Sequence, residues 1–448
     1  MSVIKFDKTN KGRLRKASRK EIENYFVSMP PGERRRKWLR KKNQYRLHTT
    51  AQLAIDHASS AVNDKELVQY IAASGPCHVI DSWGLLARAI EAALRGDAYA
   101  ATHFGYYAEL RAAFALLACE GLGIMRNRHP IVLAGGVIDC DLKGQQWNPT
   151  TKKYDKAKLV QTHALVWPAL RHWTTLSRAG DLLDELVCPA GTPLSDWLDV
   201  CGIVVPVREI ARRWLRVWGL DLSVLDDDHN ARNLASYRPS EFRRPPDLEV
   251  AEVLEFTENL WRLFEPGNQH RFPNLERFLL RRTLRMTGAS VPTVAVLEGI
   301  GISSLSANEW VTFLAKTDDP KPFELAERAR DVDDPHCHLS IISRAALLLF
   351  LSTSAARRLL VNAAYERETV AFWWKRHGSA RVLWDIDHEP VDPLDLWADI
   401  EASLKEAQLW RSGSGPGGGT LRAWRRAQPG VLDDFGSLEL AGIWGLLP

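Results

Sequence analysis

Four side chains that suit phosphodiester chemistry lie between residues 229 and 237: His229, Arg232, Asn233 and Tyr237. Cleavage of RNA without a metal ion requires a base for the 2′-hydroxyl proton and a cation for the charged phosphorane. Arginine suits the second role, because its guanidinium presents N–H donors in a fixed fork. Histidine suits the first role, because its pKa lies near neutrality. His229 and Arg232 are three residues apart and would share one face of a helix, so they are predicted to form one site.

The segment Arg232-Asn233-Leu234-Ala235-Ser236-Tyr237 resembles the Arg-Asn-x-x-x-His signature of HEPN ribonucleases. A predicted helix over residues 102–117, which contains Tyr106-Tyr107, resembles an early core helix of the same superfamily. The resemblance covers about residues 80–240. It implies a helical bundle that cleaves RNA without a metal, often with two protomers completing the site.

Tyr237 stands where this family has its catalytic histidine. A phenol, with a pKa of about 10, is a poor base at neutral pH, although it can position a phosphate. His229 is a substitute for the missing base. Alternatively, Asn233 and Tyr237 only cap and pack the helix.

Two functions follow from these residues. The missing histidine favours a non-catalytic binding or assembly subunit, and the resemblance implies a role in a bacterial stress or antiviral defence system. The alternative is a metal-independent HEPN ribonuclease that uses Arg232. The expected partners are nucleic acid, RNA rather than DNA, and either another protein or a second copy of the chain.

Positive charge is concentrated at the N-terminus. Residues 1–46 hold sixteen Lys or Arg and four Asp or Glu, a net charge of +12, so the remaining chain carries −8. Such an imbalance favours contact with phosphate groups. The residues predicted to bind nucleic acid are Arg13, Arg15, Lys16, Arg34, Arg35, Arg36, Lys37, Arg40, Lys41 and Lys42.

Two other polar clusters have simpler interpretations. His336-Cys337-His338 follows Asp331, Asp333 and Asp334, but no second ligand pair follows, so a polar loop is favoured over a zinc site. Arg126-Asn127-Arg128-His129 is either a phosphate-binding loop or a helix C-terminus with cations in their favoured place, and the second is preferred. No metal and no cofactor is predicted.

The composition indicates a cytoplasmic protein. Apolar runs such as 112–119 and 345–351 are short compared with the roughly 20 residues of a membrane-spanning helix, so no membrane contact is expected. The first residues contain no apolar stretch typical of a secretion signal. The six cysteines are scattered without a Cys-x-x-Cys pair, which is typical of reduced thiols.

Apolar residues recur at three- or four-residue spacing through most of the chain, so a mainly α fold is predicted. Short strands are expected on either side of Gly135-Gly136, within a β-like insertion near 130–160. We expect a basic extension (1–50), a HEPN-like helical domain (51–245), a second helical domain (246–411), and a Gly-rich linker with a tail (412–448).

Overall fold

The computed structural model describes residues 4–203, 211–223, 225–238, 248–267, 271–328, 334–385, 387–413 and 420–448. Helix accounts for 68% of it, and the strands form small antiparallel sheets, so the predicted mainly helical class is confirmed. The predicted boundary at residues 245–246 and most of the Gly-rich linker lie outside the described residues.

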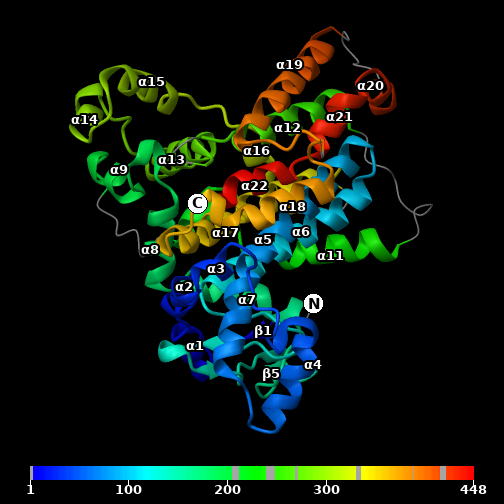
Figure 1. Ribbon diagram of the computed structural model, residues 1–448. Helices are drawn as coiled ribbons and strands as arrows, with labels where there is room; N and C mark the ends of the chain where they lie inside the picture. Colours follow the sequence, from blue (N-terminus) through cyan, green and yellow to red (C-terminus); the bar gives the residue numbers. More distant parts are fainter. Residues whose placement is uncertain are drawn as a thin grey trace.

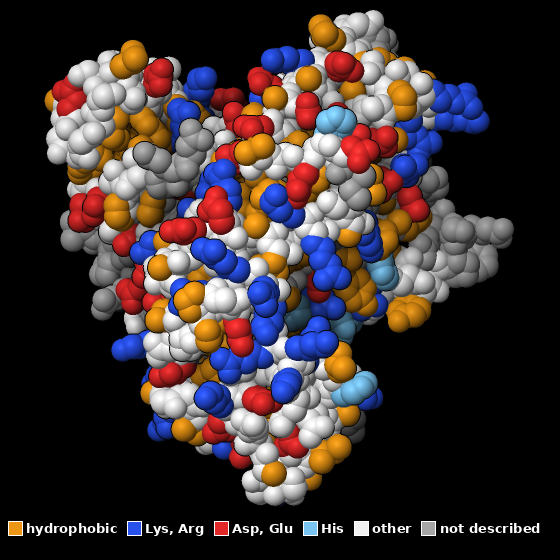
Figure 2. Space-filling view, viewed as in Figure 1, with side chains coloured by type: hydrophobic (Ala, Val, Ile, Leu, Met, Phe, Trp, Pro, Cys, Tyr) orange, Lys and Arg blue, Asp and Glu red, His pale blue; other side chains and the backbone are white. Residues whose placement is uncertain are grey.

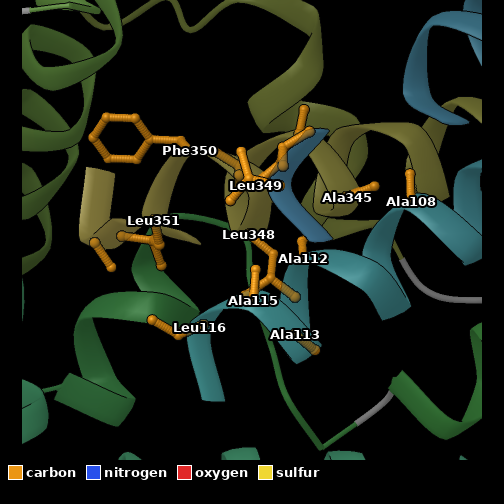
Figure 3. Packing of buried hydrophobic residues seen from close by; sticks show 14 of the residues in the cluster. Ala108, Ala112, Ala113, Ala115, Leu116, Ala345, Leu348, Leu349, Phe350 and Leu351 are labelled. Carbon is orange, nitrogen blue, oxygen red and sulfur yellow. The ribbon is translucent and has the colours of Figure 1, made fainter. Parts of the chain in front are cut away.

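Three long helices form the centre of the molecule: α5 (Asp64–Leu94), α6 (Ala98–Cys119) and α17 (Cys337–Asn362) (Figure 1). Asn63 and Asp97 begin α5 and α6 by accepting hydrogen bonds from the backbone N–H of Glu66 and Ala100. Small side chains let α6 and α17 approach closely: Figure 3 shows alanines of α6 beside Ala345 and Leu348 of α17.

The other helices of the first half are α1 (Lys8–Arg15), α2 (Arg19–Ser28), α3 (Pro31–Arg34), α4 (Tyr45–Ala58), α7 (Thr162–Trp173), α8 (Ser177–Leu186), α9 (Leu194–Val200), α10 (Ala211–Val217) and α11 (Leu225–Tyr237). Those of the second half are α12 (Val250–Leu263), α13 (Pro273–Thr287), α14 (Val294–Gly299), α15 (Ser304–Leu314), α16 (Lys321–Glu327), α18 (Ala371–Arg381), α19 (Trp397–Gly413), α20 (Leu421–Ala427), α21 (Pro429–Gly436) and α22 (Glu439–Leu446). Short 3-10 turns lie at Ala134–Gly136, Pro189–Gly191, Arg367–Val370 and Pro393–Leu396.

Segments predicted as separate domains share this central core. α17 packs against α5 and α6, and α22, from the predicted tail, packs against α5 and α17. The indole N–H of Trp83 on α5 donates to the hydroxyl of Thr353 on α17, with 3.0 Å between the atoms. Buried side chains from all four predicted segments therefore belong to one hydrophobic cluster.

Helix α17 is long and apolar enough to span a membrane by length and composition, which differs from the expectation drawn from its short apolar runs. In the structure, 94% of its most apolar window is buried inside the protein. Its neighbours α5, α6, α16 and α22 supply that cover.

The first 50 residues pack onto the rest of the chain. Strand β1 (Ile4–Lys5) pairs antiparallel with β4 (Gln145–Asn148), which pairs with β5 (Lys153–Tyr154). Helix α2 packs against α5 and α17, and Ile22 and Phe26 on it are almost completely buried. The predicted strands near residues 130–140 are present as β2 (Ile131–Val132) and β3 (Ile138–Asp139), paired antiparallel.

Candidate functional site

Helix α11 carries all four residues of the predicted site, and a buried ion pair holds it against the core. Asp226, Asp227 and Asp228 occupy its first turn, where carboxylates interact favourably with the helix dipole. Both oxygens of Asp228 accept hydrogen bonds from Arg344 on α17, at 2.6 and 2.9 Å. Each side chain of this pair is only 1% exposed. Burial alone would lower the pKa of Arg344, but Asp228 and Glu109 raise it above its ordinary value.

Arg232 lies between the two tyrosines of α6. Its guanidinium carbon is 5.3 Å from the ring centroid of Tyr106 and 5.1 Å from that of Tyr107. These distances are typical of cation–π contacts. The residue is 6% exposed, and its Nε–H is buried without a hydrogen-bond partner among the described residues. A buried donor of this kind is available to an anion that enters the site.

Histidines from three helices surround this arginine. The rings of His229 on α11 and His163 on α7 have centroids 5.3 Å apart. The His229 ring is 5.4 Å from that of Tyr106, and His103 on α6 lies 5.0 Å from the ring of Tyr107. All three histidines are partly buried. On the face shown in Figure 2, a hollow with histidine side chains at its edge lies between α4 and α11.

Local hydrogen bonds fix the orientation of the rings. The Nδ1 of His163 lies 3.1 Å from the hydroxyl of Tyr106. The Nδ1 of His229 lies 3.3 Å from the side-chain amide of Asn233, one turn further along α11. Asn233 therefore positions His229. The amide N–H of Asn233 can only donate, so a neutral His229 accepts at Nδ1 and carries its proton on Nε2. The Nδ1–H of His163 can donate to the Tyr106 hydroxyl, which leaves the Nε2 of His163 free to accept a proton.

Burial and the nearby cation keep these histidines neutral. Burial, followed by the positive charge of Arg232, lowers the pKa of His229 to about 4. Burial and then Arg232 lower the pKa of His163 and that of His103 below the ordinary value. Neutral imidazoles can accept a proton at pH 7, so the cluster offers base function beside a fixed cation.

Tyr237 does not join the cluster. It is 79% exposed at the end of α11. The structure thus brings His229, Arg232 and Asn233 together and leaves Tyr237 in solvent. Sequence reasoning missed His163 and the role of His103, whose Nδ1 lies 2.8 Å from the hydroxyl of Ser236. His103 stands four residues before Tyr107, which is a signal that could have been used, but nothing in the sequence marks His163.

The predicted nucleic-acid-binding residues fall into two groups. Arg13 pairs with Asp139 at 3.1 Å, Arg40 pairs with Glu33 at 2.8 Å, and Arg34 donates to the carbonyls of Met29 and Ala363. The exposed group comprises Arg15, Lys16, Arg35, Arg36, Lys41 and Lys42, and Lys37 is partly buried 4.0 Å from Glu33. Figure 2 shows Lys and Arg side chains gathered on the face around α3.

The remaining clusters have structural contacts. His129 is fully buried, and its ring lies between the backbone N–H of Met125 and the carbonyl of Val160. His336 lies 3.3 Å from Asp334 and 3.6 Å from Glu252, whereas Asp331 and Asp333 lie outside the described residues. No group of three or more His, Cys, Asp or Glu in the described ranges could hold a metal ion.

In comparisons with protein-family models, curated proteins and solved structures, no match to this chain was found.

Proposed function

We propose that the protein binds RNA and cleaves it without a metal ion at the cluster of Arg232, His163 and His229. The observation that carries this proposal is the convergence of one buried guanidinium and two neutral imidazoles from two different helices. The resemblance of residues 232–237 to the HEPN motif supports the same reaction. We also propose that α6 and α11 are arranged as the corresponding helices of HEPN proteins are.

The reaction needs two proton transfers. The Nε2 of His163 takes the proton of the 2′-hydroxyl, and the 2′-oxygen then attacks phosphorus. The bond from phosphorus to the 5′-oxygen breaks, and the departing oxygen takes a proton from the Nε2 of His229. The products are a 2′,3′-cyclic phosphate and a 5′-hydroxyl. A bound phosphate places negative charge beside both rings and raises their pKa, so that one ring can carry the required proton.

Arg232 stabilises the charge that develops on the phosphate. Its Nε–H is already desolvated and lacks a partner in the described part of the chain, so donation to the substrate loses no existing hydrogen bond. Asp228 is the acidic residue of α11 that is nearest to Arg232 in sequence, but its carboxylate is already paired with Arg344.

The test is cleavage of a single-stranded RNA in a buffer that contains a metal chelator. Arg232→Ala is expected to lower kcat/KM by about 10²–10³-fold, the usual loss for one donor to a developing oxyanion. Arg238→Ala is the matched control, because Arg238 is an exposed arginine just beyond α11, and it should cleave at the original rate. Tyr237→Phe should also be unaffected. Cleavage that survives in folded Arg232→Ala would rule out this site.

A second candidate function is the non-catalytic binding or assembly subunit. Two observations favour it: Arg232 is already enclosed by Tyr106 and Tyr107, and Tyr237 lies outside the cluster. This function predicts RNA binding with no cleavage by any version of the protein.

Binding to RNA in either case is expected to depend on the exposed cations near the N-terminus. Deleting the first 46 residues would remove buried core, so substitution is the better experiment. Replacing Arg35, Arg36, Lys41 and Lys42 by glutamine should lower the slope of log K against log salt by up to roughly 3, at about 0.7 per lost phosphate contact. The slope is measured by titrating RNA at several salt concentrations.

The control for this experiment replaces four exposed cations from other elements: Arg212, Arg216, Lys316 and Arg422. It has the same net charge as the N-terminal variant. If both variants show the same salt slope, the effect comes from total charge and the predicted nucleic-acid-binding segment has another role.

A further inference from the structure

A second cavity lies further along α6 from the Tyr106–Tyr107 pair. Its volume is about 480 Å³, and it is lined by residues of α4, α5, α6 and the segment after α6. Arg111 and Arg126 contribute positive charge to it, Phe114 and Tyr70 contribute rings, and Ser74 contributes a hydroxyl. A volume of several hundred Å³ suits a small organic ligand.

The charge of this cavity is one-sided. No Asp or Glu is among its lining residues within the described ranges. Arg111 has an ion pair with Asp81 at 3.8 Å, but the Asp81 side chain is 56% exposed and lies outside the lining. Arg126 is exposed. The cavity therefore favours an anionic group on its ligand.

A larger cavity, of about 790 Å³ between α10, α13 and α16, makes a useful comparison. Its four arginines face four carboxylates, those of Asp318, Asp319, Glu324 and Glu327. Asp319 forms ion pairs with both Arg282 and Arg285. The positive charge there is neutralised by the protein itself, which leaves little attraction for an anion.

Aromatic side chains lie beside the cations of the cavity on α6: Phe114 is 8% exposed, and Tyr70 is partly buried. The guanidinium of Arg111 lies over the ring of Phe114, 5.8 Å from its centroid. His78 meets the same ring edge-on at 5.4 Å and lies 3.0 Å from Arg111. Burial and then Arg111 lower the pKa of His78 to about 3, so this ring is neutral at pH 7. Rings beside guanidinium groups can stack with a nucleobase.

Two chain segments connect the lining of this cavity with the residues around Arg232. Tyr107 and Arg111 are four residues apart on α6 and so share one face of that helix. The carbonyl of Arg126 accepts hydrogen bonds from the backbone N–H and the hydroxyl of Thr162, at 3.0 and 3.2 Å. His163 follows directly. The residues that line the cavity are therefore tied to those that surround Arg232.

We propose that this cavity binds a nucleoside phosphate, with the base against Phe114 and Tyr70 and the phosphate on Arg111 and Arg126. The ligand is either a free nucleotide or one nucleotide of an RNA strand that continues to Arg232. Binding of a nucleotide of the RNA strand rests on the proposed function, whereas binding of a free nucleotide does not require RNA cleavage.

The first experiment measures binding of adenosine 5′-monophosphate to the full-length protein by calorimetry. Arg126→Ala is expected to weaken binding by roughly 10-fold or more, the usual value of a charge-assisted hydrogen bond. Arg128→Ala, in the same segment but outside the cavity lining, is the matched control and should bind normally. Ala51→Trp, at an exposed lining position, should block the cavity and abolish binding. Circular dichroism verifies that each variant is folded.

Three results would overturn the proposal: no binding of adenosine 5′-monophosphate, equal affinity in Arg126→Ala and Arg128→Ala, or equal affinity for adenosine and its monophosphate. Binding of a single-stranded RNA oligonucleotide then identifies the source of the ligand. If Arg126→Ala weakens binding of the oligonucleotide, and the mononucleotide competes with the oligonucleotide, the cavity holds a nucleotide of the strand. If only the mononucleotide is affected, the ligand is a free nucleotide. Mononucleotide binding that persists when no version cleaves RNA would leave this cavity site standing while the proposed function fails.

Discussion

Replacing Asp228 by alanine is expected to destabilise the folded protein by about 3–5 kcal/mol, because it leaves the buried Arg344 guanidinium without its partner. Both side chains are 1% exposed, so water cannot replace the lost carboxylate. The free energy of unfolding is measured by urea denaturation followed by circular dichroism.

Asp226→Ala is the matched control for this prediction. Asp226 lies on the same helical turn and pairs with Arg171 at 3.3 Å, but the side chains are 32% and 22% exposed. A pair that is partly open to solvent contributes about 0–1 kcal/mol. A double variant, Asp228→Leu with Arg344→Met, should recover part of the stability, because it removes both charges of this pair, while Glu109, the other acidic group that acts on Arg344, stays buried. Equal losses for Asp228→Ala and Asp226→Ala would contradict the importance of the buried pair.

The second large effect concerns catalysis by the two histidines. If the protein cleaves RNA as proposed, His163→Ala and His229→Ala should each lower kcat by about 10²–10⁴-fold, the usual contribution of general acid–base catalysis. The measurement is single-turnover cleavage at saturating protein. His172→Ala is the control, because His172 lies on the same helix as His163 and its ring contacts the carbonyl of Lys11 instead. Loss of activity in His172→Ala as well would point to damage of α7 and not to lost chemistry.

The pH dependence follows from the lowered pKa of His163, which burial and then Arg232 hold below the ordinary value. A base with a lowered pKa stays neutral to a lower pH than a free imidazole does. The acidic limb of kcat/KM should therefore lie below pH 6.5, the value for an unperturbed histidine. A fall near 6.5 in the wild-type protein would exclude His163 as the base in the free enzyme.

Local features of the fold could be predicted from the sequence, whereas long-range pairing could not. Apolar spacing indicates α6 and α17, Asp97 caps the start of α6, and the turn at Gly135-Gly136 indicates β2 and β3. The pairing of Ile4 with Gln146 joins residues far apart in the chain, and no local pattern encodes it. The basic composition of residues 1–46 suggested an extension, although Ile22 and Phe26, four residues apart, already indicate a buried helix face.

The candidate site shows the same division. His229, Arg232 and Asn233 lie within one helix, so their common location follows from helical spacing alone. His163 joins them only because α7 packs against α6, and a single histidine near a helix start carries no signal of that contact. The resemblance to the motif predicts Tyr237 in the site, but this residue is the last of α11 and is 79% exposed.

Helix α6 has no fully exposed position at which a substitution would be neutral for the protein. None of its residues from 98 to 119 is fully exposed. Its alanines fit against α17, Tyr106 and Tyr107 enclose Arg232, and Arg111 with Phe114 lines the cavity. Most helices of a globular protein have one solvent face on which random substitutions accumulate without harm. A library that randomises this helix should consequently yield almost no folded members, whereas the same library at α20, with several exposed positions, should be largely tolerated.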